Sequence, residues 1–204
     1  MSKRLFRAVL IAITVALVVY IAVTAAFGPS DPYAHGHEEP VTAYVKQNVT
    51  PWLSDPVVLA AVEAQNRKHQ ALTKADIDKL DGEWVRVRKA KSPNVLMDAL
   101  MKNELATFLR KKKETSGGAI AELIVMDNKG LNVGQTNPTL DYMQGDEPKW
   151  QKSFGLGTDA IFVDKVENEG GLKVSQTSLT ISDPMTKKAI GAITVVVDVE
   201  KLPK

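Results

Sequence analysis

The chain has no cysteine among its 204 residues. Disulfides, covalent haem attachment and thiolate metal sites are therefore excluded. Histidine is also scarce: the three histidines lie at or before His69, so a Ser-His-Asp arrangement would need a base from outside the C-terminal half. No P-loop or dinucleotide-binding glycine pattern occurs. We therefore expect a protein that is not an enzyme and needs no cofactor.

Charge is absent from a run of 20 residues, 8–27, that is rich in Val, Ile, Leu and Ala. This length suits a helix across a bilayer core of about 30 Å. Basic residues lie only on its N-terminal side, so the positive-inside rule places residues 1–7 in the cytoplasm and the rest outside. A cleaved signal peptide is the alternative, but its apolar region is shorter, about 7 to 15 residues. We predict a transmembrane anchor.

Acidic residues are missing before Asp31, and Lys3, Arg4 and Arg7 supply the excess positive charge. Beyond residue 27 the chain carries 23 basic and 24 acidic residues. A domain with nearly balanced charge lacks the basic surface that nucleic acids require. We expect no nucleic-acid partner.

Residues 28–40 are predicted to be a linker, because Gly28-Pro29 breaks the helix and Pro40 closes the segment. Within it, His35-Gly36-His37-Glu38 resembles a short metal-binding tract. Two imidazoles without a helix to set their geometry are a weak metal signal. A solvated linker is the preferred interpretation.

Apolar residues recur at helical spacing between residues 41 and 113, and three start signals divide this region. Asp55-Pro56 combines a capping residue with a proline in the first turn, and Thr73 to Asp76 resembles a capping box. Ser92-Pro93 is expected to open a third helical segment that runs past Leu109. The first half of the domain is therefore predicted to be helical.

The second half contains runs rich in β-branched residues, separated by turn residues. The predicted strands are residues 120–126, 131–136, 161–166, 172–179 and 189–199. Helices followed by strands indicate an α+β domain over residues 41–204, with a five-stranded antiparallel sheet.

The segment 141–150, DYMQGDEPKW, lies between two of these strand blocks and concentrates acids, amides and aromatics. This mixture is more typical of a site than of a core. Asp146 is expected to cap a short helix through Trp150, and the segment to close a pocket over one face of the sheet. Asp146 could instead be only a cap, and Trp150 only a core residue.

These residues also carry a resemblance. The run 125–136, the segment 141–150, and the stretches Ile181–Pro184 and Ile190–Ala192 together resemble the single Cache (PDC, PAS-like) extracytoplasmic sensor domains of bacterial receptors. The resemblance covers roughly residues 40 to 200. It implies a periplasmic domain that binds a small molecule, and it does not identify that molecule.

The last arginine is Arg110, so the sheet half contains no guanidinium to hold a carboxylate. Acids beside aromatic rings suit an ammonium group instead. The sequence thus favours an amine or amino-acid-like ligand. The predicted ligand-binding residues are Asp141, Tyr142, Gln144, Asp146, Lys149, Trp150, Gln176 and Ser178.

The residues after the last predicted strand are few, and typical members of the family continue into an output module. We therefore expect a single-pass protein of the bacterial inner membrane, with its domain in the periplasm, that signals through a separate membrane protein. The alternative is an accessory subunit of an inner-membrane complex that uses the Cache fold for docking. A periplasmic enzyme, with Asp141 and Asp146 as paired carboxylates, is the third possibility.

Overall fold

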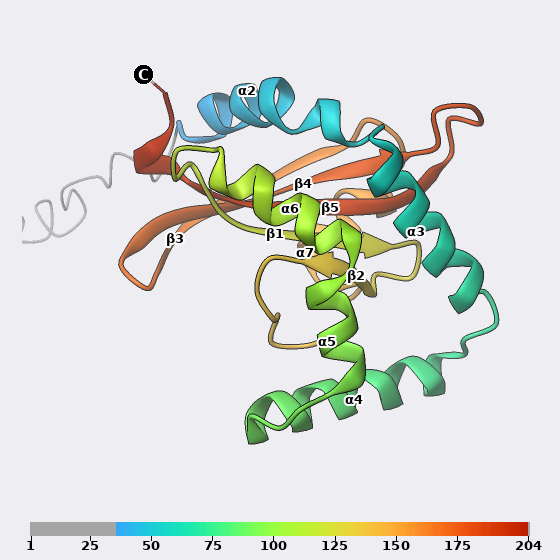
Figure 1. Cartoon of the computed structure of the whole chain (residues 1–204). Helices are drawn as coiled ribbons and strands as arrows, with labels where there is room; N and C mark the ends of the chain where they lie inside the picture. The colour runs from blue at the N-terminus through green and yellow to red at the C-terminus, as the bar shows by residue number, and fades with distance from the viewer. Residues whose placement is uncertain (1–35, 204) are drawn as a thin grey trace, which may run out of the picture. The chain divides into compact units, whose positions relative to one another are not determined.

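The computed structural model describes residues 36–203, and these form an α+β unit with its helices first and its strands afterwards (Figure 1). The predicted tail 1–7 and anchor 8–27, and most of the linker 28–40, lie outside the described residues. The last residues of that linker belong to the first turn of α2 (Glu38–Asn48). Among the described helices, none combines the length and the apolar character that a membrane crossing requires.

The predicted helix starts are confirmed where a side chain caps the backbone. Asp55 accepts a hydrogen bond from the backbone N–H of Val57 at 2.9 Å, at the start of α3 (Pro56–His69). Thr73 and Asp76 form a reciprocal capping box at the start of α4 (Lys74–Ala90). Such caps satisfy backbone donors that have no partner within the helix.

The third predicted helix is two helices, α5 (Val95–Lys102) and α6 (Glu104–Glu114). Asn103 separates them with an extended backbone, and its Oδ1 accepts a hydrogen bond from Ala106 N at 2.7 Å. Its Nδ2 donates to Val133 O at 2.8 Å. This side chain caps α6 and ties it to the sheet, so the chain turns there instead of continuing as one helix.

The five predicted strands are confirmed as one antiparallel sheet in the order β2-β1-β5-β4-β3. In the middle of the sheet Val125 pairs with Ile193 and Thr177 with Val195. The strands span the following residues: β1 Ile120–Asp127, β2 Asn132–Gln135, β3 Ile161–Glu169, β4 Leu172–Ser182 and β5 Ala189–Asp198.

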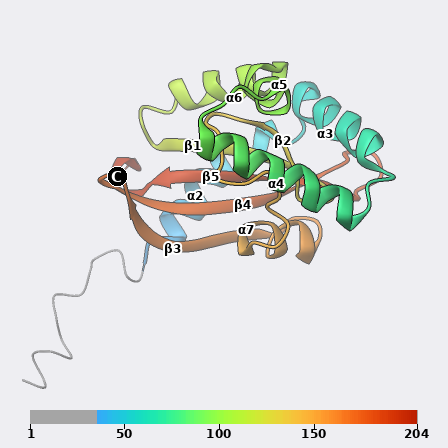
Figure 2. The same cartoon turned by 90° about the horizontal axis from the view of Figure 1, so that it is seen from below.

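The two faces of the sheet are covered differently (Figure 2). Ile124, Met126 and Ala192 form a small core on one face, and Trp150 of α7 (Pro148–Gln151) and Phe154 of the short helix η2 (Phe154–Leu156) pack against it. Gly191 is the neighbour of Ala192 along β5. It lies against Val62 of α3, on the opposite face of the sheet. Helices α2, α3 and α6 thus cover one face, and the segment between β2 and β3 lies over the other.

Helix α4 belongs to a smaller, separate core. Trp84 of α4 packs with Leu100 of α5 and with Leu131 and Tyr142, which follow β1 and β2. The rings of Trp84 and Tyr142 stack with centroids 5.6 Å apart. Figure 1 shows α4 and α5 extending away from the sheet at one end of the unit.

Candidate functional site

A cavity of about 320 Å³ lies between the sheet and the segment that joins β2 to α7. We call this segment, residues 136–147, the cavity loop. Strand side chains form one wall and the loop forms the other. The lining residues are Arg88, Glu122, Ile124, Pro138, Thr139, Leu140, Asp141, Gln144, Glu147, Lys149, Glu169, Gln176 and Val196.

The cavity brings together four of the eight predicted site residues: Asp141, Gln144, Lys149 and Gln176. Asp141 and Gln144 come from the cavity loop, Lys149 from α7 and Gln176 from β4. Glu122 and Gln176 point to the same side as Ile124, because alternate residues of a strand share a face. The predicted closure of a pocket over one sheet face is thus what the fold produces.

The two aromatic residues of the prediction are placed elsewhere. Tyr142 is fully buried against Trp84, and burial raises the pKa of its hydroxyl well above the usual range. Trp150 stacks on Phe154 with centroids 4.8 Å apart and donates from Nε1 to Asp127 O at 3.2 Å. Neither is among the described residues that line the cavity. The expected aromatic surface for an ammonium group is absent from this cavity, because both rings pack in cores.

Ser178 and Asp146 also lie outside the cavity lining. Ser178 shares the face of Gln176 but is fully buried, with its hydroxyl 2.8 Å from Oγ1 of Thr194. Asp146 is exposed and does not cap α7, since the N-cap position is Glu147 and no side chain caps that helix. The prediction of Asp146 as a cap was wrong by one residue, because Pro148 takes the first helical position.

Carboxylates outnumber basic groups around the cavity. Glu122, Asp141, Glu147 and Glu169 face Arg88 and Lys149. Nζ of Lys149 lies 3.0 Å from Oε2 of Glu147, and the lysine is only 8% exposed. Within residues 36–203 the other three carboxylates form no ion pair with a lysine or arginine. The lining therefore has an excess of acidic over basic side chains.

Two of these carboxyls hold their protons more tightly than usual. Burial raises the pKa of Glu122, and the nearby Glu169 adds to the effect. Burial likewise raises the pKa of Asp141, with Glu147 and Asp81 contributing through repulsion between like charges. Desolvation and neighbouring anions both disfavour the ionised form. A cation placed among these groups would remove part of that cost.

Gln144 adds to the cavity a buried amide oxygen that lacks a hydrogen-bond partner within the described residues. Its Nε2 donates to the backbone oxygen of Asp141 at 3.0 Å and also to the carboxylate of Asp141. Its Oε1 is buried and has no hydrogen-bond partner within the described residues. A buried acceptor without a partner is costly unless a ligand or water supplies a donor.

Arg88 corrects the argument that the site lacks a guanidinium. The sheet half has no arginine, but Arg88 reaches the cavity from α4 and donates from Nη2 to Pro138 O at 3.2 Å. The guanidinium retains further donors for a carboxylate. The sequence argument failed because it considered only residues near the cavity loop along the chain.

Three charged lining residues lie outside the segment 141–150 and were not considered for the site: Arg88, Glu122 and Glu169. Glu122 had a signal of its own, since a glutamate interrupts the apolar strand Ile120–Asp127. An acid at a half-buried strand position must either reach solvent or face a polar cavity. Arg88 and Glu169 lie in ordinary charged stretches and carry no such signal.

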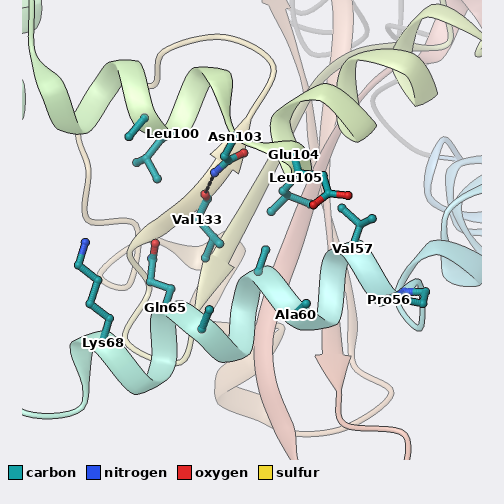
Figure 3. Close-up of a pocket in the computed structure, with 13 residues that line it drawn as sticks. Pro56, Val57, Ala60, Gln65, Lys68, Leu100, Asn103, Glu104, Leu105 and Val133 are labelled. Carbon is teal, nitrogen blue, oxygen red and sulfur yellow. Dashed lines mark hydrogen bonds between the residues drawn. The ribbon is translucent and has the colours of Figure 1, made fainter.

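A larger cleft, of about 610 Å³, lies between α3 and the α5–α6 pair (Figure 3). Its lining is mostly apolar, and none of the eight predicted site residues belongs to it. The polar side chains at its floor are already engaged, since Asn103 donates to Val133 O and Gln65 donates to Asn132 O. The cavity lined by Glu122, Asp141, Glu147 and Glu169, which we call the acidic cavity, is therefore the better candidate site.

The described residues hold no cluster of His, Cys, Asp or Glu suited to a metal.

No protein-family model matches the chain, and no curated protein matches it. Solved structures do. The sensor domain of the Vibrio cholerae histidine kinase DctB is 18% identical, with a TM-score of 0.36, over 69% of this chain and 55% of that one. The sensory domain of the Campylobacter jejuni chemoreceptor Tlp3, solved with isoleucine bound, is 18% identical, with a TM-score of 0.37, over 85% and 66%. The sensor domain of Escherichia coli DcuS is 12% identical, with a TM-score of 0.36, over 61% and 92%.

The chain is thus structurally similar, at low identity and low TM-score, to these Cache-type sensor domains. It spans less than two thirds of the DctB and Tlp3 domains. At these identities and TM-scores the likeness does not identify a ligand for this chain.

Proposed function

We propose that this domain is a sensor that binds a small ligand carrying an ammonium group, of the amino-acid class, in the acidic cavity. One observation supports this most directly: Glu122, Asp141 and Glu169 line one cavity, and within residues 36–203 none of them forms an ion pair with a lysine or arginine. The raised pKa values of Glu122 and Asp141 are the electrostatic cost of that arrangement. A bound cation would offset this cost.

The cavity also offers partners for the rest of an amino acid. The free Oε1 of Gln144 can accept a hydrogen bond from the ammonium group. Arg88, which lines the same cavity, can pair with a carboxylate. Ile124 and Val196 supply apolar surface from the sheet. A volume of about 320 Å³ lies near the lower end of the range of about 300 to 1,000 Å³ for ligand pockets, which suits a small molecule.

The setting of the domain remains part of the proposal. Residues 8–27 would anchor the chain in the bacterial inner membrane and place the domain in the periplasm. The ligand signal would then pass to a separate membrane protein. The sequence argument for the anchor supports this arrangement, and the cavity supports the ligand.

The test is a thermal-unfolding screen of the full chain, purified in mild detergent, with ethanolamine, L-isoleucine, L-alanine and succinate. A ligand at one hundred times its dissociation constant stabilises the fold by about 2.7 kcal/mol. We expect the amino acids to raise the unfolding temperature and succinate to leave it unchanged. Stabilisation by succinate alone would overturn the proposal, and so would a folded protein that responds to none of the four.

Substitutions then locate the site. Asp141→Asn should weaken binding of the amino acids at least tenfold, because it removes one carboxylate of the cavity. Asp78→Asn is the matched control, since Asp78 is exposed on α4 and pairs with Lys74 of the same helix. Equal loss in both variants would place the ligand elsewhere.

A further inference from the structure

Helix α4 presents three polar side chains to the cavity loop, from Asp81, Trp84 and Arg88. Spacings of three and four residues place them along one face of the helix. Each of the three makes hydrogen bonds to the backbone of the loop and not to its side chains. One face of α4 therefore fixes the backbone of the cavity loop by hydrogen bonds.

The contacts run along the loop in order. Arg88 donates from Nη2 to Pro138 O at 3.2 Å, and Trp84 donates from Nε1 to Thr139 O at 3.1 Å. Oδ1 of Asp81 accepts from the backbone N–H groups of Tyr142 at 2.8 Å and Met143 at 3.0 Å. Tyr142 is fully buried, so its N–H group needs such a partner. A carboxylate acceptor makes these bonds stronger than neutral ones.

The cavity-lining residues of the loop lie next to the residues whose backbone is bonded to α4. Leu140 and Asp141 lie between Thr139 and Tyr142, and Gln144 follows Met143. All three line the cavity, as does Arg88 itself. A shift of α4 relative to the sheet would therefore move the acidic side chain and the free amide oxygen that face the ligand.

On its other side the loop is attached to the β1–β2 hairpin. Asn132 N–H donates to Tyr142 O at 3.1 Å, and Gln144 N–H donates to Gly130 O at 2.7 Å. Leu131 and Met143 form an isolated β-bridge. The loop thus lies between the sheet edge and α4, whose apolar residues pack on the loop and on α5.

We infer that α4 sets the position of the cavity wall, with Asp81 as the positioning residue, so that ligand occupancy and the placement of α4 depend on each other. This inference rests on the proposed ligand site for its functional meaning. If the ligand binds better with α4 docked than undocked, α4 docking must favour the ligand by the same factor. Helix α4 would then respond to the state of the cavity.

The test is amide-resolved hydrogen exchange in the full chain without ligand, comparing the native protein with Asp81→Ala. The Tyr142 and Met143 amides lose their acceptor directly, so their faster exchange decides nothing. The decisive groups are the amides of Asn132 and Gln144, which Asp81 does not contact. We expect their exchange to rise at least tenfold, while the amides of the β1–β5 pairing stay unchanged.

Two further variants keep the test sharp. Asp78→Ala, on the exposed side of α4, should leave all these amides unchanged. Asp81→Asn keeps one acceptor oxygen, so it should increase the exchange rates of Asn132 and Gln144 less than Asp81→Ala does. The asparagine variant also provides the test if the alanine variant does not fold. If only Tyr142 and Met143 exchange faster, the contact is local and the inference is overturned.

Because this test uses no ligand, it is independent of the thermal screen. Faster exchange of the Asn132 and Gln144 amides in Asp81→Ala would support α4 as the positioning element even if the native protein binds none of the four probes. In that case only the ligand proposal would be overturned. Tight amino-acid binding that Asp81→Ala leaves within twofold would overturn the inference and leave the ligand proposal standing.

Discussion

Nδ1 of His69, the last residue of α3, lies 2.8 Å from Oδ2 of Asp127 at the end of β1, and both side chains are buried. The same carboxylate accepts from Gln65 Nε2 at 3.0 Å and from the Leu131 backbone N–H at 2.9 Å. One acid thus joins α3 to the β1–β2 hairpin beneath the cavity loop. These donors satisfy the oxygens of an acid that would be costly to bury without partners.

Replacing His69 by phenylalanine should therefore destabilise the fold by about 2 kcal/mol, because a buried carboxylate loses a partner. Chemical denaturation followed by circular dichroism measures this. Arg67→Ala on the same helix is the control: Arg67 forms an exposed pair with Glu63, and such pairs contribute about 0.2 to 1 kcal/mol. A His69 variant as stable as the control would contradict the role assigned to the pair.

Two glycines should respond to alanine with opposite signs. Gly130 has φ +80°, and a Cβ there would lie 2.3 Å from Cα of Gly145. Gly130→Ala should cost at least about 2 kcal/mol, since both the left-handed backbone and the clash are unfavourable. Gly82 lies within α4 with nothing within 4 Å of its Cβ position, so Gly82→Ala should stabilise the fold by roughly 0.5 to 1 kcal/mol. Thermal unfolding of both variants checks the pair of signs.

The raised pKa of Glu122, caused mainly by burial, predicts a pH-dependent effect of Glu122→Gln. A carboxyl whose pKa is higher in the folded state stabilises the fold fully below its unfolded pKa of roughly 4, and this contribution is lost as the pH rises through the folded-state pKa. The glutamine variant should therefore unfold at a higher temperature than the native protein at pH 7, with the difference vanishing towards pH 4. Glu83→Gln, exposed on α4, is the control. A difference that is constant with pH would contradict the prediction.

Arg88→Met should separate an amino-acid ligand from a simple amine. Arg88 is the guanidinium that lines the cavity, and only a ligand with a carboxylate can use it. Titration calorimetry should show that the substitution weakens the binding of L-isoleucine at least tenfold more than the binding of ethanolamine. An equal loss for both ligands would mean that Arg88 acts only by holding Pro138.

Local signals allowed several features to be predicted from the sequence. The capping residues Asp55 and Thr73 lie beside the backbone groups that they satisfy, and turn residues separate the five strands. The break at Asn103 was missed, because an asparagine within an apolar helical run does not show by itself whether it caps a new helix. Its role depends on Val133, which lies 30 residues away.

The candidate site was predictable only in part, for the same reason. Asp141 and Gln144 were found because polar residues cluster in one loop between strands. Tyr142 was expected in the cavity, but the fold places Trp84 against its ring and buries it. An isolated tyrosine in a loop has an apolar ring that suits a core as well as a pocket.

The sequence by itself determined the order of helices and strands, the antiparallel sheet and the loop that closes over it, because caps, turns and hydrophobic periodicity act between near neighbours. Only the tertiary structure decided which side chains meet at the cavity. Asp81 bonds to Tyr142 across a separation of 61 residues, and Arg88 reaches Pro138 across 50. Such pairings depend on how α4 packs against the cavity loop, and no local pattern in the chain encodes that packing.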